Sequence, residues 1–147
     1  MRETLAYMAQ IVRDWRHLPE VTEPARSIIA GVPEKDTAGE IAALFSFVRD
    51  SVRYTMDTNG VERLQTPDYT LRVRQGDCDD KSILLAALLE SVGIPARFVA
   101  VGFSPDYFEH VYVEALLDDG WVALDATENV PPGWAPPDPV TRINQAI

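Results

Sequence analysis

The segment 78–92 constrains the fold most strongly, because its apolar residues leave a helix no polar face. If this segment is helical, aliphatic side chains lie on nearly every side of it: Ile83, Leu84, Ala86, Ala87, Leu88, Leu89 and Val92. A helix that is apolar all round must be buried by other elements on all sides. Gly93 and Pro95 follow the last apolar residue and are typical of a helix end. The sequence therefore predicts a buried central helix.

The only cysteine of the chain stands at the start of this helix, in the run Gly-Asp-Cys-Asp-Asp-Lys at 76–81. Unpaired amides and the helix dipole stabilise a thiolate at a helix N-terminus, so Cys78 is a candidate nucleophile. Asp77 is the expected N-cap, but Asp77, Asp79 and Asp80 also place negative charge around the thiol and should raise its pKa. A lone cysteine is most often inert core filling. At the start of a helix and among acids, Cys78 is about equally consistent with a nucleophile and with an inert core residue.

The first third of the chain is predicted to be helical. Apolar residues recur at helical spacing over 3–17, and a second, short helix is expected over 24–30. Thr37 and Glu40 have the spacing of a capping box, which predicts the start of a third helix at about 38–53. From 54 to 75 the pattern is that of a long irregular connection, with turn signals at Asn59-Gly60 and Thr66-Pro67-Asp68. A short strand is expected near 70–74.

Strands follow the central helix. The segments 97–103, 110–117 and 121–126 read as strands, and Asp118-Asp119-Gly120 between the last two indicates a hairpin. The proline-rich tail, 131–147, is expected to lie extended over the surface. Helices first and strands afterwards indicate an α+β fold, with the central helix packed on an antiparallel sheet. A chain of 147 residues is expected to form one domain.

A nucleophilic cysteine needs a base, and the base needs a group that orients it. His110 opens a predicted strand, and Asp125 ends the next one. A tight hairpin on Asp119-Gly120 would pair Glu114 with Asp125 and put His110 on the same face as Asp125, but about 13 Å along the strand. A direct contact would require a wider loop, at about 115–120, that sets His110 opposite Asp125.

Four blocks carry a resemblance to a known family: 76–80, 93–97, 110–114 and 120–127. Over roughly residues 40–127 the chain resembles the transglutaminase-like superfamily, in its compact bacterial or tailed-phage form. The resemblance implies a papain-like core with Cys78 as nucleophile, His110 as acid and base, and Asp125 as the orienting carboxylate. It also implies that the hairpin takes the wider register.

The domain implied by this resemblance spans 1–147, with a core at about 38–127, N-terminal helices over 3–31 and the extended tail. In such a core the backbone amide of Cys78 and one upstream side chain would stabilise the oxyanion. The sequence leaves four candidates for that side chain: Tyr54, Asn59, Gln65 and Gln75.

Neither a cofactor nor a metal is expected. Asp77, Asp79 and Asp80 are spaced somewhat like calcium ligands, but the glycine and the terminal glutamate of an EF-hand loop are missing. Cys78 with His110 and one carboxylate offers too few sulfur and imidazole groups for a structural zinc site.

The net charge of −10 argues against sequence-independent nucleic-acid binding and against anionic membrane surfaces. The N-terminus lacks the pattern of a signal peptide, and no apolar run is long enough to span a membrane. The expected location is the cytoplasm, or a virion if the chain is phage-encoded.

Two function hypotheses follow. The first is a cysteine-dependent acyl-transfer enzyme that hydrolyses or transamidates a peptide or protein carboxamide through Cys78, His110 and Asp125. The second is a catalytically inactive binding or assembly module of the same fold, for example a virion or tail assembly protein. Within the first hypothesis, family resemblance does not separate protease, amidase and transamidase, because fold does not fix function.

Overall fold

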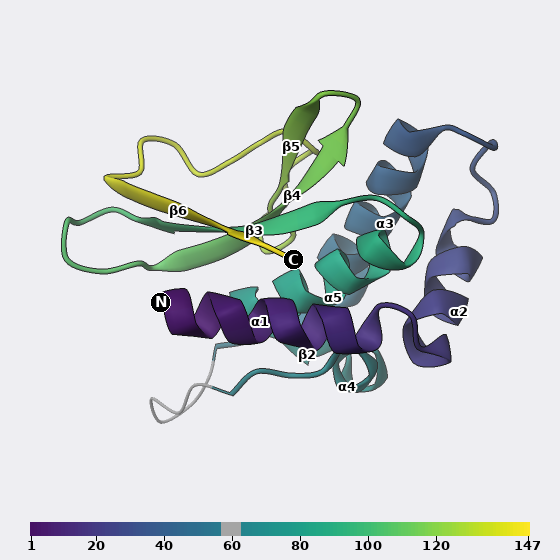
Figure 1. The fold of residues 1–147 in the computed structure, drawn as a ribbon, viewed down its shortest axis with the longest axis horizontal. Helices are drawn as coiled ribbons and strands as arrows, with labels where there is room; N and C mark the ends of the chain where they lie inside the picture. The colour runs from purple at the N-terminus through teal and green to yellow at the C-terminus, as the bar shows by residue number, and fades with distance from the viewer. Residues whose placement is uncertain (57–62) are drawn as a thin grey trace.

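The computed structural model describes residues 1–56 and 63–147, and it confirms the α+β fold (Figure 1). Its helices are α1 (Arg2–Trp15), α2 (Pro19–Ile29), α3 (Thr37–Ser51), α4 (Pro67–Val73) and α5 (Cys78–Ser91). Its strands are β1 (Arg53–Tyr54), β2 (Gln75–Gly76), β3 (Ala96–Gly102), β4 (His110–Leu117), β5 (Gly120–Leu124) and β6 (Thr141–Ala146). The turn predicted at Asn59-Gly60 lies outside the described residues.

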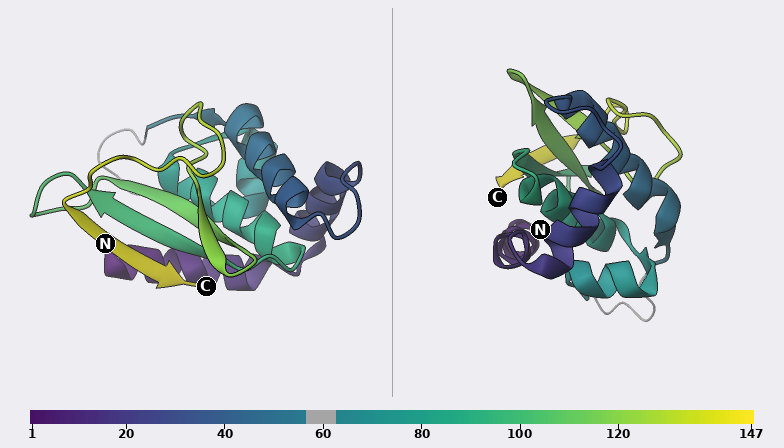
Figure 2. Two further views of the ribbon diagram at one scale, coloured as in Figure 1. Left: turned by 90° about the horizontal axis from the view of Figure 1, so that it is seen from above. Right: turned by 90° about the vertical axis from the view of Figure 1, so that its right-hand side faces the viewer.

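Helix α5 is the buried central helix that the sequence predicts. Every side chain from Ile83 to Leu89 is fully buried. The other four helices all contact α5, and so do strands β3 and β4. Seen from above, the sheet lies over α1 and α5 (Figure 2). Burial on all sides explains how a helix with no polar face is stable in this fold.

The main sheet is antiparallel, with the strand order β5-β4-β3-β6. One face packs on α5 and belongs to the main core; Phe98, Ala100, Val111, Val113 and Leu124 contribute to it. The opposite face carries a small second cluster of Val99, Val101, Tyr112 and Ala123, which Ala135 of the tail partly covers. The strands therefore alternate between two buried faces, and most residues of the central strands β3 and β4 are apolar.

Two expectations about the N-terminal helices are wrong. Helix α2 begins at Pro19 rather than at residue 24, and Pro24 lies inside it. A proline at the first helical position has the right φ and lacks an N–H that would be unpaired in any case. Helix α3 is capped by Asp36, whose carboxylate accepts a hydrogen bond from the Gly39 amide at 2.9 Å, and not by a Thr37–Glu40 capping box.

The short strand predicted near residues 70–74 is wrong, because this segment belongs to α4. Pro67 starts α4 at its first position, and the helix ends at Arg74 in the left-handed conformation, with φ at 57°. The segments that flank the connection form a two-residue parallel ladder, in which Arg53 pairs with Gln75 and Tyr54 with Gly76.

Both hairpin registers considered from the sequence are also wrong. Leu117 pairs with Gly120, so the loop is Asp118-Asp119, and Asp118 adopts a positive φ of 55°. The tail is not extended over the surface throughout, because β6 adds to the sheet beside β3. A strand after the prolines carried no strong signal, since its residues (Thr-Arg-Ile-Asn-Gln-Ala) are mostly polar.

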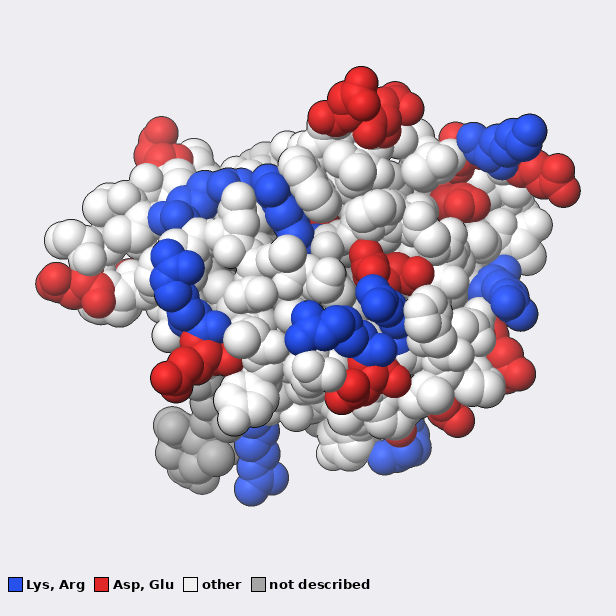
Figure 3. Space-filling view, viewed as in Figure 1, with Lys and Arg blue, Asp and Glu red and all other residues white. Residues whose placement is uncertain are grey.

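Charged side chains of both signs are interspersed on the face shown in Figure 3. Within the described ranges, none of the helices combines the length and the apolar character needed to cross a membrane.

Candidate active site

Cys78 is the first residue of α5, and the loop before it is held by the capping box of that helix. The Asp80 amide donates to Asp77 Oδ1 at 3.0 Å, and the Asp77 amide donates to Asp80 Oδ2 at 3.1 Å. The Gln65 amide also donates to Asp80 Oδ1 at 2.9 Å. The expected N-cap, Asp77, is confirmed. These bonds fix the position of Cys78 at the start of the helix.

The thiol of Cys78 lies against the start of β4. Burial raises the pKa of Cys78, and a hydrogen bond with the backbone of Val111 offsets part of this rise. One turn further along α5, the hydroxyl of Ser82 donates to the Val111 carbonyl at 3.3 Å. Cys78 therefore adjoins the residue that directly follows His110, the first residue of β4.

His110 and Asp125 are in direct contact. His110 Nε2 lies 2.7 Å from Asp125 Oδ2, and Asp125 is fully buried. The other oxygen of Asp125 accepts hydrogen bonds from the Thr127 amide at 3.1 Å and from the Thr127 hydroxyl at 2.7 Å. Burial by itself would raise the pKa of Asp125, but the hydrogen bond and charge of His110, with the Thr127 bonds, hold it below its usual value.

The observed register explains how these two side chains meet. Because Val113 pairs with Leu124, continuing the ladder places Asp125 opposite Tyr112 and makes His110 its diagonal neighbour. Diagonal neighbours lie on one face, as strand parity predicts, and within reach of long side chains. The ring of Tyr112 stacks beside that of His110, with the ring centroids 6.3 Å apart. A diagonal contact needs no wider loop.

The electrostatic environment of Cys78 disfavours a thiolate, as expected from the acidic residues that surround it in the sequence. Burial is the main cause of its raised pKa, and the charges of Asp79 and Asp77 add to it. Asp79 Oδ1 lies 3.7 Å from Cys78 Sγ. Burial and the neighbouring carboxylates also raise the pKa of Asp77, to about 8. At neutral pH the resting cysteine is therefore a thiol, and it needs a base to react.

The upstream candidates for an oxyanion donor differ in what they contact. Gln65 Oε1 accepts a hydrogen bond from Thr70, and Gln75 Oε1 accepts one from Arg53. Asn59 lies outside the described residues. Tyr54 pairs with Gly76, two residues before Cys78, and it is 45% exposed. Partial burial raises the pKa of Tyr54, and the nearby Cys78 raises it further. The phenol therefore keeps its proton and remains a hydrogen-bond donor.

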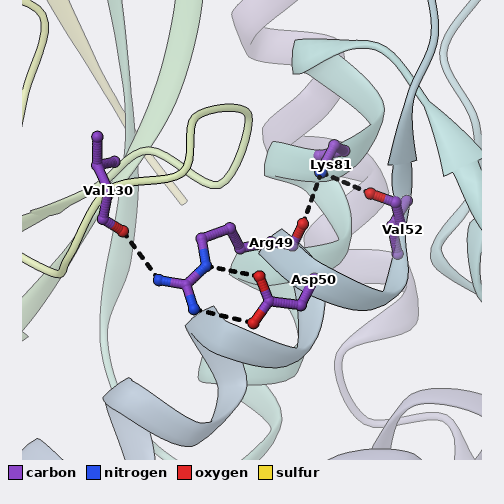
Figure 4. A network of polar contacts seen from close by, with 5 residues as sticks. All are labelled: Arg49, Asp50, Val52, Lys81 and Val130. Atoms are coloured by element: carbon purple, nitrogen blue, oxygen red, sulfur yellow. Dashed lines mark hydrogen bonds and ion pairs between the residues drawn. The ribbon is translucent and has the colours of Figure 1, made fainter.

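The sequence analysis assigned no role to Lys81, which is only 2% exposed in the structure. Its ammonium group donates to the Val52 carbonyl at 2.6 Å and makes a longer contact of 3.4 Å with the Arg49 carbonyl (Figure 4). Burial lowers the pKa of Lys81 to about 8, although the charges of Asp125 and Asp50 oppose the shift. The available signal was a lysine at the start of an otherwise apolar helix.

In the part of the chain that the structure describes, no three His, Cys, Asp or Glu side chains form a group that could hold a metal ion.

Comparison with known proteins gives a family and a set of related folds. The family model of the transglutaminase-like superfamily matches residues 25–126. No curated protein matches the chain.

Three solved structures are similar in fold. A candidate cysteine protease from Cytophaga hutchinsonii has a TM-score of 0.61 at 22% identity, over 78% of this chain and 40% of that one. A candidate protease from Parabacteroides distasonis has a TM-score of 0.69 at 14% identity, over 87% of this chain and 26% of that one. LapG from Legionella pneumophila has a TM-score of 0.62 at 17% identity, over 97% of this chain and 87% of that one. The chain thus spans less than half the length of the first two.

Proposed function

We propose, from the premise that the chain belongs to the transglutaminase-like superfamily, that it is a cysteine-dependent acyl-transfer enzyme. Cys78 is the nucleophile, His110 the acid and base, and Asp125 the orienting group. The observation that carries this proposal is the 2.7 Å contact between His110 and buried Asp125. The Cys78 thiol lies beside this pair, because it bonds to the backbone of Val111, the residue after His110.

The ring of His110 has one nitrogen available for the reaction, because Nε2 is in contact with Asp125. In the proposed mechanism Nδ1 accepts the proton of the Cys78 thiol as the sulfur attacks an amide carbonyl. The same proton then passes to the leaving amine, and a thioester remains on Cys78. Asp125 stabilises the imidazolium that forms in between. A base that acts during attack suits a thiol whose resting pKa is raised.

The oxyanion of the tetrahedral intermediate would be stabilised by two donors. One is the backbone amide of Cys78 at the N-terminus of α5. The other is the hydroxyl of Tyr54, because Tyr54 pairs with Gly76, two residues before Cys78 in the chain.

The proposed substrate is a peptide or protein carboxamide. Water would complete hydrolysis of the thioester, and an amine would complete transamidation. Two of the similar structures are described as candidate proteases, which favours hydrolysis. A cytoplasmic location, or one in a virion or tail, remains a prediction.

The second candidate function is an inactive binding or assembly module. The observation that favours it is the raised pKa of Cys78, which opposes nucleophilic reactivity. The two candidates differ in whether His110 activates the thiol, and this difference can be measured directly.

The test is the rate of Cys78 alkylation by iodoacetamide, followed by mass spectrometry on the only cysteine of the chain. At about pH 7 we expect His110→Ala to react at least about tenfold more slowly than wild type, because a positioned base is lost. His17→Ala, which changes the other, exposed histidine, is the matched control and should react like wild type. Equal rates in wild type and His110→Ala would favour the binding module.

A further inference from the structure

Lys81 caps the C-terminal end of α3, although it belongs to α5. It lies on α5, three residues after Cys78, and its ammonium group reaches the carbonyls of Val52 and Arg49 (Figure 4). These carbonyls lie at the C-terminal end of α3, where backbone acceptors have no partner within the helix. A cation there also interacts favourably with the helix dipole. Lys81 therefore helps to fix where α3 ends relative to α5.

The end of α3 leads directly to Tyr54. Val52 is the C-cap of α3 and has an extended backbone. The next two residues form β1, where the Arg53 amide donates to the Arg74 carbonyl and the Thr55 amide to the Gly76 carbonyl, both at 2.9 Å. Tyr54 is thus held on both sides, by Lys81 at Val52 and by the β1–β2 ladder.

The last turn of α3 is also tied to the segment that follows Asp125. The guanidinium of Arg49 donates to the Val130 carbonyl at 3.0 Å and forms a two-point ion pair with Asp50 (Figure 4). Lys81 lies within electrostatic range of both Asp50 and Asp125, which favour its charged form. The ammonium group is thus at the junction of α3, α5 and the chain after β5.

We propose that Lys81 is a positioning residue that holds Tyr54 beside Cys78 by fixing the end of α3. The inference rests on the proposed function, in which Tyr54 donates to the oxyanion. It assigns Lys81 no contact with substrate, and it predicts that Lys81 matters only for a reaction that forms an oxyanion.

Two reactions at the same sulfur separate positioning from activation of the thiol. Iodoacetamide reacts by displacement of iodide, and no oxyanion forms. With p-nitrophenyl acetate, the sulfur bonds to the acetyl carbon through a tetrahedral oxyanion, and the bond to oxygen then breaks to release p-nitrophenolate. The thiol proton goes to His110 in both reactions. Oxyanion donors therefore accelerate the second reaction and not the first.

The experiment measures both rates in wild type, Lys81→Met, Tyr54→Phe and the double variant. We expect each single substitution to slow acylation by about tenfold or more, with alkylation within about twofold of wild type. Because Lys81 acts through Tyr54, the double variant should be no slower than Tyr54→Phe. Lys35→Met, which changes the other, exposed lysine, is the matched control and should leave both rates unchanged.

Three results would overturn the proposal. The first is equal slowing of both reactions in Lys81→Met, and the second is an unchanged acylation rate in that variant. The third is a double variant whose acylation is slowed by the product of the two single effects. If Lys81→Met does not fold, Lys81→Gln replaces it. Its amide keeps one donor for the Val52 carbonyl, so acylation should lie between wild type and Tyr54→Phe, and a rate below that of Tyr54→Phe would contradict the proposal. If wild type reacts with neither reagent, or without need of His110, the proposed function itself fails.

Discussion

The three carboxylates beside Cys78 are adjacent in sequence but make different contacts. Asp77 and Asp80 exchange the two bonds of the capping box, and Asp80 also accepts the Gln65 amide. Asp79 instead lies against the thiol. The capping pair is a structural device that orders the start of α5, while Asp79 adjusts the charge at the sulfur.

Asp77 should make the stability of the protein depend on pH. Its pKa is about 8 in the folded protein, so the folded state keeps a proton that the unfolded state loses near pH 4. Stability should therefore fall as pH rises between these values. Asp77→Asn cannot titrate and keeps an acceptor for the Asp80 amide. At about pH 8 we expect this variant to be more stable than wild type by at least about 1 kcal/mol.

Urea unfolding between about pH 5 and pH 8 measures this difference. The wild-type free energy of unfolding should decline across the range, and that of Asp77→Asn should decline less. Parallel curves for the two proteins would show that Asp77 titrates normally in the folded state.

Among the elements, α3 offers a direct comparison of two capping arrangements. Asp36→Ala removes the carboxylate that accepts the Gly39 amide, so we expect the free energy of unfolding to fall by about 1 kcal/mol. Thr37→Ala is the matched control, since Thr37 is not the cap, and its effect should stay within about 0.5 kcal/mol. Thermal or urea unfolding of the two variants measures both values. A larger loss in Thr37→Ala would favour the capping box read from the sequence.

The elements that the sequence predicts well are those whose pattern is long and clearly bounded. Helix α5 is recognisable because its apolar run ends at Gly93, and β4 because Val111 and Val113 alternate before a clear turn signal. Helix α4 was missed because Leu71 and Val73 alternate with arginines as in a strand, although Pro67 marks a helix start. Strand β6 depends on pairing with β3, which its own residues do not encode strongly.

Residue type and strand parity predict which residues form the candidate site, but not how they contact one another. Cys78, His110 and Asp125 follow from chemistry that few residues can supply. The contact between His110 and Asp125 depends on the register, which the position of the Asp118-Asp119 loop decides. The role of Lys81 depends on where α3 ends beside α5. A lysine in an otherwise apolar helix is a local signal, but it does not show which distant segment the side chain contacts.

For the whole molecule, charge is the property with a measurable consequence. The chain carries 23 acidic and 13 basic residues, so repulsion between like charges opposes the compact state. Salt screens this repulsion over about 10 Å at 0.1 M. We therefore expect the melting temperature to rise by a few degrees, which corresponds to about 1 kcal/mol, between low and physiological ionic strength. A melting temperature that falls with added salt would show that attractive ion pairs, such as Arg97–Glu114, outweigh the repulsion.

The β1–β2 ladder limits which changes the segment that it encloses can accept. The chain leaves the site after Tyr54 and returns to it at Gly76, and paired backbones hold both points together. Replacing this segment whole would disturb the site, because α4 packs on α5 and the Gln65 amide donates to Asp80. Libraries that test the proposed function should therefore vary its exposed positions, such as Tyr69 and Arg72, and keep the buried face of α4 unchanged.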